Sequence, residues 1–254
     1  MNVLAITQAR IGSTRLPKKI LKSINGVSLL EMHLKRIKQS KLISKVKVAT
    51  TAETDSNKIV NVCHKLGIEV HKGSLNNVLD RFYETALPEK PDWVVRLTSD
   101  CPLIDSIEID KVIQFAIEKD LDYASNTLTP TFPDGIDVEV FKFSALEKAW
   151  KEAKITSELE HVTPYIWKNS TYKGGNLFKS DCVMNSNDYS AIRLTVDNIE
   201  DFQVIEALVK SIGYNKPWME YVELLEKQPE IRKINKHLSR NEGYEKSINK
   251  DNIV

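Results

Sequence analysis

The sequence predicts an α/β protein in which helices flank a mostly parallel sheet. In the first half of the chain, short apolar runs alternate with longer runs whose apolar residues recur at helical spacing. This pattern is typical of parallel strands joined by helical crossovers. The composition, with 41% hydrophobic and 28% charged residues over 254 residues, is that of an ordinary globular chain. Together these observations favour a Rossmann-like mixed sheet with a small insertion.

The expected elements of the first half alternate between strand and helix. A helix begins near Ser28, because Ser28 and Glu31 have capping-box spacing. A second helix ends at Gly67, since glycine favours helix termination. A third helix has an apolar face that leaves Asp80 and Arg81 outside it, near the helix start. The strands expected around these helices are residues 3–7, 46–49, 68–71 and 92–97.

The segment over residues 123–180 has a less regular pattern and is interpreted as an insertion in the sheet domain. An alternating run at residues 136–141 predicts a strand, and apolar spacing predicts helices near residues 145–152 and 158–167. The segment therefore adds to the sheet domain and is not expected to fold separately.

The end of the chain divides into a regular and an irregular part. A final strand, residues 192–196, leads into a helix over residues 199–212. We expect one domain over residues 1–240, followed by a polar tail at 241–254 that lacks apolar periodicity. Such a tail is expected to be frayed or held by a partner.

Charge and cysteine content exclude several classes of function. The net charge of +1 gives no field that would attract nucleic acid or an acidic membrane. No signal-peptide pattern and no long apolar run is present, so we expect a cytoplasmic, soluble protein with neither a nucleic-acid nor a membrane partner. Cys63, Cys101 and Cys182 are far apart and form no Cys-x-x-Cys pair, so no zinc site is expected.

A basic loop directly follows the first predicted strand. Arg10, Arg15, Lys18 and Lys19 lie within it, and Gly12 and Ser13 allow a ligand to approach the backbone closely. Cations and backbone N–H groups in such a loop can bind a polyphosphate. The loop matches neither the P-loop nor the Gly-x-Gly-x-x-Gly pattern, which disfavours ATPases and dinucleotide-binding proteins. From charge alone, a solvated basic loop is an equal alternative.

Two aspartates follow predicted strands. Asp100 lies beyond strand 92–97 and Asp197 beyond strand 192–196, so both can reach the edge of the sheet where ligands bind. Carboxylates there can hold Mg²⁺, which offsets negative charge during phosphoryl transfer. The alternatives are a capped turn for Asp100 and a helix cap for Asp197, since Asp197 and Glu200 have capping-box spacing.

Further polar residues are candidates for binding a second substrate. Asp137 and Glu139 alternate in a predicted strand and share a face, which suits a polar pocket or a solvated sheet surface equally. His161 is a candidate general base or anion ligand. Its alternative is a surface position on a helix that starts with a Ser157 and Glu160 capping box.

Several ordered motifs resemble those of a known family. The chain is similar to the sugar cytidylyltransferases, which include the CMP-Kdo and CMP-sialic acid synthetases, and especially to their SpsF-type branch of spore-coat polysaccharide biosynthesis. The resemblance spans about residues 1–225. Its motifs are Ala9-Arg10 with residues 13–19, and residues 78–82, 96–103, 134–141, 160–165 and 194–197. At Lys18, where the Kdo and sialic-acid enzymes usually have glycine, this chain departs from the pattern, and a less tightly turned loop is expected.

The resemblance implies the nucleotide-diphospho-sugar transferase fold and an Mg²⁺-dependent transfer of CMP from CTP to a sugar acid or phosphorylated sugar-like acceptor, with pyrophosphate release. It also implies a role in surface polysaccharide synthesis and a homodimer with residues 123–180 as a contact or acceptor-binding region. It implies catalytic roles for Arg10, Lys19, Asp100 and Asp197, the two aspartates holding the metal. The implied nucleotide-binding residues are Ala9, Arg10, Gly12, Ser13, Arg15, Lys19, Thr50, Thr51, Asp80, Arg81 and Thr98. The implied acceptor-binding residues are Asp137, Glu139, His161 and Tyr165.

Two other functions are compatible with the sequence. A glycosyltransferase of the same fold would use a nucleotide sugar, but such enzymes commonly carry an Asp-x-Asp motif, and Asp100 is followed by Cys101 and Pro102. A noncatalytic nucleotide-binding protein is disfavoured because the charged residues needed for transfer are all present.

Overall fold

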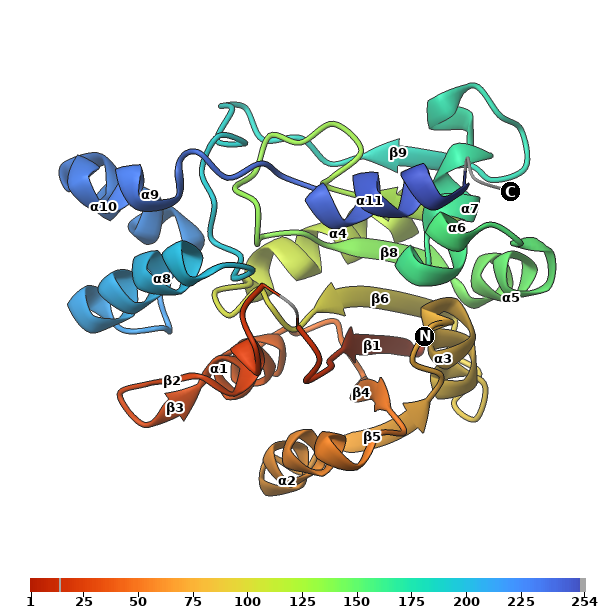
Figure 1. The fold of residues 1–254 in the computed structure, drawn as a ribbon. Helices are drawn as coiled ribbons and strands as arrows, with labels where there is room; N and C mark the ends of the chain where they lie inside the picture. The colour runs from red at the N-terminus through yellow and green to blue at the C-terminus, as the bar shows by residue number, and fades with distance from the viewer. Residues whose placement is uncertain (14, 252–254) are drawn as a thin grey trace.

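Seven strands form one mixed sheet in the part of the chain that the computed structural model describes, residues 1–13 and 15–251. The strand order is β5-β4-β1-β6-β8-β7-β9 (Figure 1). The first four are parallel, and β8 pairs antiparallel with both β6 and β7. This confirms the predicted mostly parallel sheet. The strands are β1 (Val3–Gln8), β4 (Lys45–Thr51), β5 (Glu69–Gly73), β6 (Trp93–Thr98), β7 (Tyr123–Ser125), β8 (Glu139–Lys142) and β9 (Ser180–Cys182).

Helices cover both faces of the sheet because alternate residues of the central strands are apolar on both sides. Val3 and Ala5 of β1 pack in one core cluster with residues of α1, α2 and α4. Leu4 and Ile6 pack in another with residues of α3, α5 and α7. These helices are α1 (Leu29–Ile37), α2 (Asn57–Lys65), α3 (Val78–Ala86), α4 (Ser106–Glu118), α5 (Phe143–Glu152) and α7 (Pro164–Lys168).

The remaining helices lie between and after these elements. A third core cluster joins α8 and α9 to the segment around Leu194. The helices are α6 (Thr156–His161), α8 (Ile199–Ile212), α9 (Trp218–Lys227), α10 (Pro229–Asn235) and α11 (Glu242–Asp251), with the short 3-10 helices η1 (Lys19–Leu21), η2 (Thr54–Ser56) and η3 (Thr171–Lys173) and the hairpin strands β2 (Ser23–Ile24) and β3 (Val27–Ser28).

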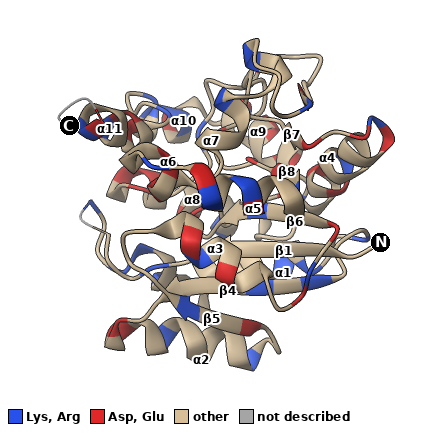
Figure 2. Cartoon of the chain, turned by 90° about the vertical axis from the view of Figure 1, so that its right-hand side faces the viewer, with Lys and Arg blue, Asp and Glu red and all other residues tan. Residues whose placement is uncertain are grey.

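Local signals in the sequence set several helix ends as expected. The Ser28 side chain accepts a hydrogen bond from the Glu31 backbone N–H at the start of α1. Gly67 has a φ of +65° just beyond α2, where its lack of a Cβ avoids strain. Acidic and basic residues are interspersed over the elements seen in Figure 2, in keeping with the net charge of +1.

The predicted strand at residues 192–196 is wrong. The segment is extended, with a single isolated bridge between Asp134 and Arg193. Its apolar residues are buried, including Leu194 and Val196, so the apolar run is explained by packing under α8 and not by strand pairing.

The predicted helix at 158–167 is interrupted. It forms α6 and α7, separated at Val162, whose φ is 73°. Pro164 explains the break, because a proline restricts the residue before it and lacks the N–H that a continuous helix needs. The Ser157 and Glu160 capping box is also wrong, since Ile155 is the N-cap of α6 and Ser157 lies inside it.

The polar tail is ordered through its described part. Residues 242–251 form α11, which packs beside α6 and runs across the molecule in front of β8 (Figure 1). The expectation of a frayed end is wrong. Polar contacts hold this helix in place, and such contacts leave no apolar periodicity in the sequence. Thr14 of the basic loop and residues 252–254 of the tail lie outside the described residues. Among the described helices, none is long and apolar enough to cross a membrane.

Candidate active site

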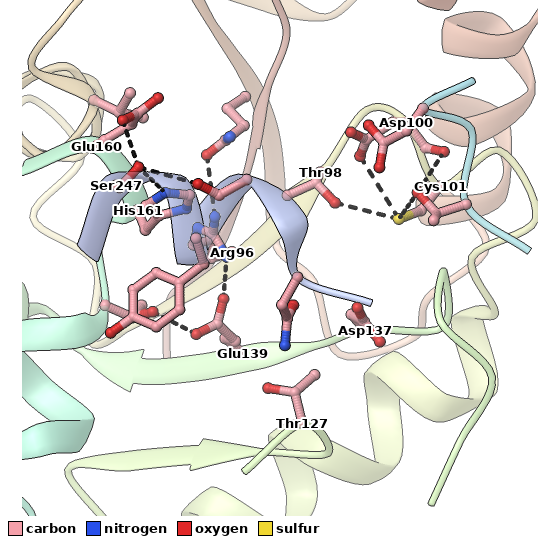
Figure 3. Close-up of a pocket in the computed structure, with 18 of the residues that line it drawn as sticks. Arg96, Thr98, Asp100, Cys101, Thr127, Asp137, Glu139, Glu160, His161 and Ser247 are labelled. Atoms are coloured by element: carbon pink, nitrogen blue, oxygen red, sulfur yellow. Dashed lines mark hydrogen bonds and ion pairs between the residues drawn. The ribbon is translucent and has the colours of Figure 1, made fainter. Parts of the chain in front are cut away.

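A cavity of about 680 Å³ opens beside the carboxyl ends of β1 and β6. Gln8 and Ala9 line it from the end of β1, and Thr98 and Asp100 from the end of β6. Figure 3 shows Asp100 at one end of the pocket and Ser247 of α11, with Glu160 and His161, at the other. Open α/β sheets bind ligands at this edge, so the cavity is the candidate active site.

The structure brings the two predicted aspartates together around one lysine. The Lys19 ammonium lies 2.8 Å from an Asp100 carboxylate oxygen and 2.7 Å from an Asp197 carboxylate oxygen. The Val196 backbone N–H donates to the Asp100 carbonyl at 2.8 Å, which fixes the extended segment beside the end of β6. Arg15 adds a second cation 2.9 Å from Asp197. Residues far apart in the sequence thus form one charge cluster.

Mutual attraction keeps Lys19 and Asp100 ionised despite burial. Burial by itself would raise the pKa of Asp100, but Lys19 and a hydrogen bond from Thr98 bring this pKa well below its usual range. Burial likewise opposes the charge of Lys19, and the coulombic attraction of Asp100 and Asp197 raises its pKa above the ordinary value. Lys19 and Asp100 are therefore both charged at neutral pH.

Arg193 pairs with the carboxylate of Asp197 and with two further carboxylates. Its guanidinium contacts Asp201 at 2.8 Å, Asp134 at 2.6 Å and Asp197 at 2.9 Å. Burial disfavours the charge of Arg193, but the hydrogen bond that it donates to Asp201 and the three carboxylates raise its pKa. Sequence reasoning missed this role of Arg193. Asp197 and Asp201 are near it in the sequence, but the extended segment and the start of α8 bring them together only in the fold, and Asp134 lies 59 residues away. We refer to Lys19, Asp100, Arg193 and Asp197 as the charged floor.

The alternative of a helix cap for Asp197 is resolved by the structure. The capping box of α8 is formed by Asn198 and Asp201, so Asp197 is not the N-cap. Its backbone N–H donates to Asp201 at 2.9 Å. Its carboxylate is left to face Lys19 and Arg15 in the cavity.

Two cations without an acidic partner in the described part of the chain lie on the nucleotide side. Arg10 is exposed. Arg81 is buried and its guanidinium donates to the Ser74 carbonyl, so the prediction that Arg81 lies outside the buried face of its helix is wrong. Arg10 and Arg81 line the cavity, and neither has an acidic partner within 4.0 Å among the described residues. Burial, together with the nearby charge of Arg10, lowers the pKa of Arg81 to about 10. Other predicted nucleotide-binding residues that line the cavity are Ala9, Ser13, Arg15, Lys19 and Thr98.

Several predicted nucleotide-binding residues lie elsewhere. The Asp80 carboxylate accepts a hydrogen bond from the Trp150 indole at 2.9 Å and does not line the cavity. Thr51 donates to Glu53, and Thr50 is buried with no partner for its hydroxyl among the described residues. Gly12 is exposed outside the cavity lining.

Lys18 takes the backbone conformation that a glycine would adopt most easily. Its φ is 57° and its ψ is 26°, in the left-handed region at the start of η1. The expected looser turn is therefore wrong. The chain keeps the turn and tolerates a non-glycine residue in it.

The predicted acceptor residues are only partly brought together. Asp137, Glu139 and His161 line the cavity, whereas Tyr165 lies outside it and its hydroxyl donates to Glu152. Burial and the neighbouring carboxylates outweigh the opposing charge of the adjacent Arg240 and raise the pKa of Asp137 to about 7.

Glu139 is fully occupied by protein partners. It pairs with Arg96 and accepts hydrogen bonds from the hydroxyls of Tyr123, at 2.7 Å, and Thr163. Because these partners satisfy its carboxylate, Glu139 orients the groups around it and offers few positions to a ligand.

His161 and Glu160 are linked through Ser247 of α11. Ser247 Oγ donates to Glu160 Oε2 at 2.7 Å and lies 3.0 Å from His161 Nε2. A hydroxyl has one proton, so when it donates to Glu160, the His161 Nε2–H must donate to Ser247. Burial, together with Arg96, lowers the pKa of His161 to about 4. His161 is thus neutral at pH 7, with Nδ1 left as an acceptor.

The C-terminal segment supplies cavity residues that sequence reasoning did not identify. Arg240, Tyr244, Lys246, Ser247 and Lys250 all line the cavity. They lie in a polar stretch with no motif. We refer to the cavity-lining residues of 240–250 as the C-terminal wall.

Known proteins resemble this chain over most of its length. The cytidylyltransferase family model matches residues 4–237. A spore coat polysaccharide biosynthesis protein, SpsF, from Bacillus subtilis is 32% identical over 84% of this chain and 88% of that protein. A 3-deoxy-manno-octulosonate cytidylyltransferase from Trichlorobacter lovleyi is 33% identical over 45% of this chain and 44% of its own length.

A solved structure agrees with these sequence matches. A cytidylyltransferase from Leptospira borgpetersenii superposes with a TM-score of 0.86 and 33% identity, covering 94% of this chain and 99% of that one. The family match, the fold and the arrangement of the cavity lead to one conclusion. The chain belongs to the cytidylyltransferase family, whose members are CTP-dependent nucleotidyltransferases.

Proposed function

We propose that this enzyme transfers CMP from CTP to an anionic sugar or sugar-like acceptor and releases pyrophosphate. The observation that carries the proposal is the convergence of Lys19, Asp100 and Asp197 beside the basic loop, at the carboxyl edge of β1 and β6. Such a cluster places fixed charges where a triphosphate reacts.

In the proposed reaction an acceptor oxygen attacks the α-phosphorus of CTP. The new oxygen–phosphorus bond forms as the bond to the bridging oxygen of pyrophosphate breaks, and pyrophosphate leaves with that electron pair. Arg10 and Arg81, which lack acidic partners among the described residues, are suited to the phosphate oxygens, with Arg15 and Lys19 beside them. Ala9, Ser13 and Thr98 line the same side.

The acceptor hydroxyl must lose a proton during this step. His161 is the proposed base, because it is neutral at pH 7 and its Nδ1 can accept a proton. Asp137 lines the cavity beside Arg240 and is proposed to bind acceptor hydroxyls.

The charged floor fits a magnesium ion in its donor chemistry. Two carboxylates already converge on one cation, the Lys19 ammonium. No larger group of His, Cys, Asp or Glu side chains suited to a metal is present among the described residues. Mg²⁺ is commonly bound by one or two carboxylates together with substrate phosphates and waters. Asp100 and Asp197 would hold it, and it would neutralise charge that develops on the phosphates.

The relatives suggest the acceptor class and the biological role. One is named for transfer to 3-deoxy-manno-octulosonate, a sugar acid, and another for spore coat polysaccharide biosynthesis. We extend both to this chain as the proposal that it makes a precursor of a surface polysaccharide. Loss of the gene would then alter the sugar composition of that polysaccharide, and an unaltered composition would contradict the role.

The proposed assembly is a homodimer in which the segment over residues 123–180 forms contacts. Sedimentation equilibrium at micromolar concentration should give twice the monomer mass. A monomer mass over the whole concentration range would exclude the dimer.

The reaction is tested by pyrophosphate release. Each of CTP, UTP, GTP, ATP and dTTP is supplied with Mg²⁺ and a panel of sugar acids and sugar phosphates. Release that requires CTP and one acceptor would support the proposal. Cleavage of a nucleotide sugar without pyrophosphate release would favour a glycosyltransferase, and CTP binding without any turnover would favour a noncatalytic role.

A further inference from the structure

The helix α11 presents one of its faces to the cavity. Gly243, Lys246, Ser247 and Lys250 all line the cavity and occupy positions i, i+3, i+4 and i+7 of the helix. Residues at this spacing lie along the same side of a helix. In Figure 3 the helix crosses over β8 between Ser247 and the strand end near Asp137. The C-terminal wall therefore covers the part of the cavity built on β8.

This wall lies beyond the part of the chain that the family match covers. The cytidylyltransferase family model matches residues 4–237 and ends before α11 begins at Glu242. The charged floor and the basic loop lie inside the match. The residues that line the cavity from α11 therefore lie outside the part of the chain that the family match covers.

Charge is balanced differently in the charged floor and on α11. Lys19 and Arg193 in the floor each pair with carboxylates. Arg240, which precedes α11, pairs with Asp137. Lys246 and Lys250 have no acidic partner within 4.0 Å among the described residues, and both are exposed at the cavity. The C-terminal wall thus offers unneutralised positive charge to whatever lies beneath it.

A second observation also indicates a ligand under α11. The Tyr244 hydroxyl is buried and has no hydrogen-bond partner among the described residues, although Tyr244 lines the cavity. Its ring is held edge-on against His161 and Trp167, so the side chain has a defined position. A buried hydroxyl without a partner costs free energy. The Tyr244 hydroxyl has almost no accessible surface in this conformation, so it must turn toward the cavity before a ligand acceptor atom can remove that cost.

Other residues attach α11 to the protein and leave the lysines free. Ser247 bonds to Glu160 and His161, Glu242 pairs with Arg15 at 2.8 Å, and Asp251 accepts from the Ser157 N–H at 2.9 Å. Because these contacts are made by other side chains, the helix can stay in place while Lys246 and Lys250 bind a ligand.

We propose that α11 is the acceptor-binding element of this enzyme, in which Lys246 and Lys250 bind an oxyanion of the acceptor, a carboxylate or a phosphate, and Tyr244 donates a hydrogen bond to it. The identification of this anion as the acceptor substrate rests on the proposed transfer reaction. The anion site itself is defined by α11 and can be tested without turnover.

The first experiment measures amide hydrogen exchange in α11 of the full-length protein. The probes are inorganic phosphate, gluconate as a carboxylate, and glucose as an uncharged sugar. Phosphate or gluconate should slow exchange over residues 242–251, and glucose should not. The K246Q/K250Q variant should lose the effect. The anion that protects α11 identifies the preferred oxyanion, and absence of protection by both anions would overturn the site.

The second experiment uses steady-state kinetics with an acceptor found by pyrophosphate release. K246Q/K250Q should raise the acceptor KM about tenfold, as expected for the loss of charge-assisted contacts, and leave the CTP KM within about twofold. K246R/K250R should restore most of the affinity. The matched control K65Q/K227Q removes two exposed lysines on α2 and α9, outside the cavity, and should change neither KM.

The outcomes separate the two proposals. An equal rise in the CTP KM, or no change in the acceptor KM, would overturn the assignment of the lysines to the acceptor. Anion protection of α11 without any CTP-dependent pyrophosphate release would leave the anion site standing and contradict the proposed reaction.

Discussion

The charged floor and the C-terminal wall face the same cavity but are built differently. In the floor the side chains of Lys19 and Arg193 are only 12% and 7% exposed, and each pairs with two or more carboxylates. In α11 only Ser247 is buried, and the lysines that face the cavity have no acidic partner among the described residues. The side chains of the floor are held in place by their own ion pairs, whereas the lysines of the wall are available to pair with a ligand.

This difference fits a division of labour between the two substrates. Charges that stabilise a reacting triphosphate act best when they are already oriented, since no reorganisation is then needed. An acceptor differs from enzyme to enzyme, and an element held by a few polar contacts can change without disturbing the floor. Changes in the floor should therefore have large effects and changes near the wall smaller ones.

The largest effect is expected for Asp100→Asn. The substitution removes a charge beside Lys19 and one of the two carboxylates proposed to hold Mg²⁺. We expect pyrophosphate release to fall by about 10³-fold, or about 4 kcal/mol. Initial rates at saturating CTP measure it. Asp181→Asn, which changes a half-exposed aspartate paired with Lys119 outside the cavity, is the control. More than a tenth of the activity left in D100N would show that Asp100 is not essential.

The next effect concerns stability. Arg193→Met leaves Asp201, which is fully buried, and Asp134 without their cation. Breaking a buried ion pair is expected to lower the free energy of unfolding by about 3 kcal/mol. Urea denaturation followed by circular dichroism measures it.

Arg15→Met provides the contrast within the same cavity. Arg15 and Glu242 are 29% and 30% exposed, so this variant should lose less than about 1 kcal/mol. Equal losses of unfolding free energy in the Arg193 and Arg15 variants would mean that the floor contributes no more to folding than the contact between Arg15 and Glu242 of α11.

The two regions also differ in how well the sequence predicts them. The two aspartates of the floor come after apolar runs in the sequence. The pattern of buried strands therefore predicts the position of Asp100 beyond β6. The pattern does not distinguish a paired strand from a buried extended segment, which is why residues 192–196 were predicted as a strand. Both bury an apolar run, and only the presence of a neighbouring strand separates them.

Tertiary contacts explain the remaining differences. Asp80 and Tyr165 have residue types suited to ligand binding, yet each is occupied by a neighbour, Trp150 and Glu152. Arg193 meets Asp134, 59 residues away, only when the fold is complete. The helix α11 has little apolar content, so its order comes from hydrogen bonds to α6 that no local pattern reveals.

An effect smaller than that of Arg193→Met is expected at the junction of the wall with α6, and it depends on pH. The folded pKa of His161 is about 4, below its ordinary value of 6.5, because of burial and the charges of Arg96 and Arg10; Glu160 and Glu139 act in the opposite direction. The native state therefore binds fewer protons than the unfolded state between these values. The stability that neutral His161 contributes is present above pH 6.5 and is lost as the pH falls toward 4.

The variant His161→Gln tests this effect. When the pH is lowered from 6.5 to 4, the free energy of unfolding should fall by about 2 kcal/mol less in this variant than in the wild type. Urea denaturation at several pH values measures the difference. His64→Gln, at an exposed position on α2, should follow the wild type. Parallel curves for H161Q and the wild type would contradict the assignment of a depressed pKa to His161.

The smallest effect is expected at Lys18, next to the floor. Lys18 is exposed and adopts a φ of 57°, where a Cβ costs free energy that glycine avoids. Lys18→Gly should therefore raise the free energy of unfolding by about 0.5 kcal/mol, because the relief of strain is partly offset by the greater freedom of glycine in the unfolded chain. Lys18→Ala keeps the Cβ and should give no gain, which separates backbone strain from the loss of a positive charge. Calorimetric titration should find the CTP affinity of K18G within about twofold of the wild type, since Lys19 keeps both carboxylate partners. A loss of CTP affinity in K18G but not in K18A would mean that the strained turn itself orients Lys19, so that the rigidity of the floor would extend into the basic loop.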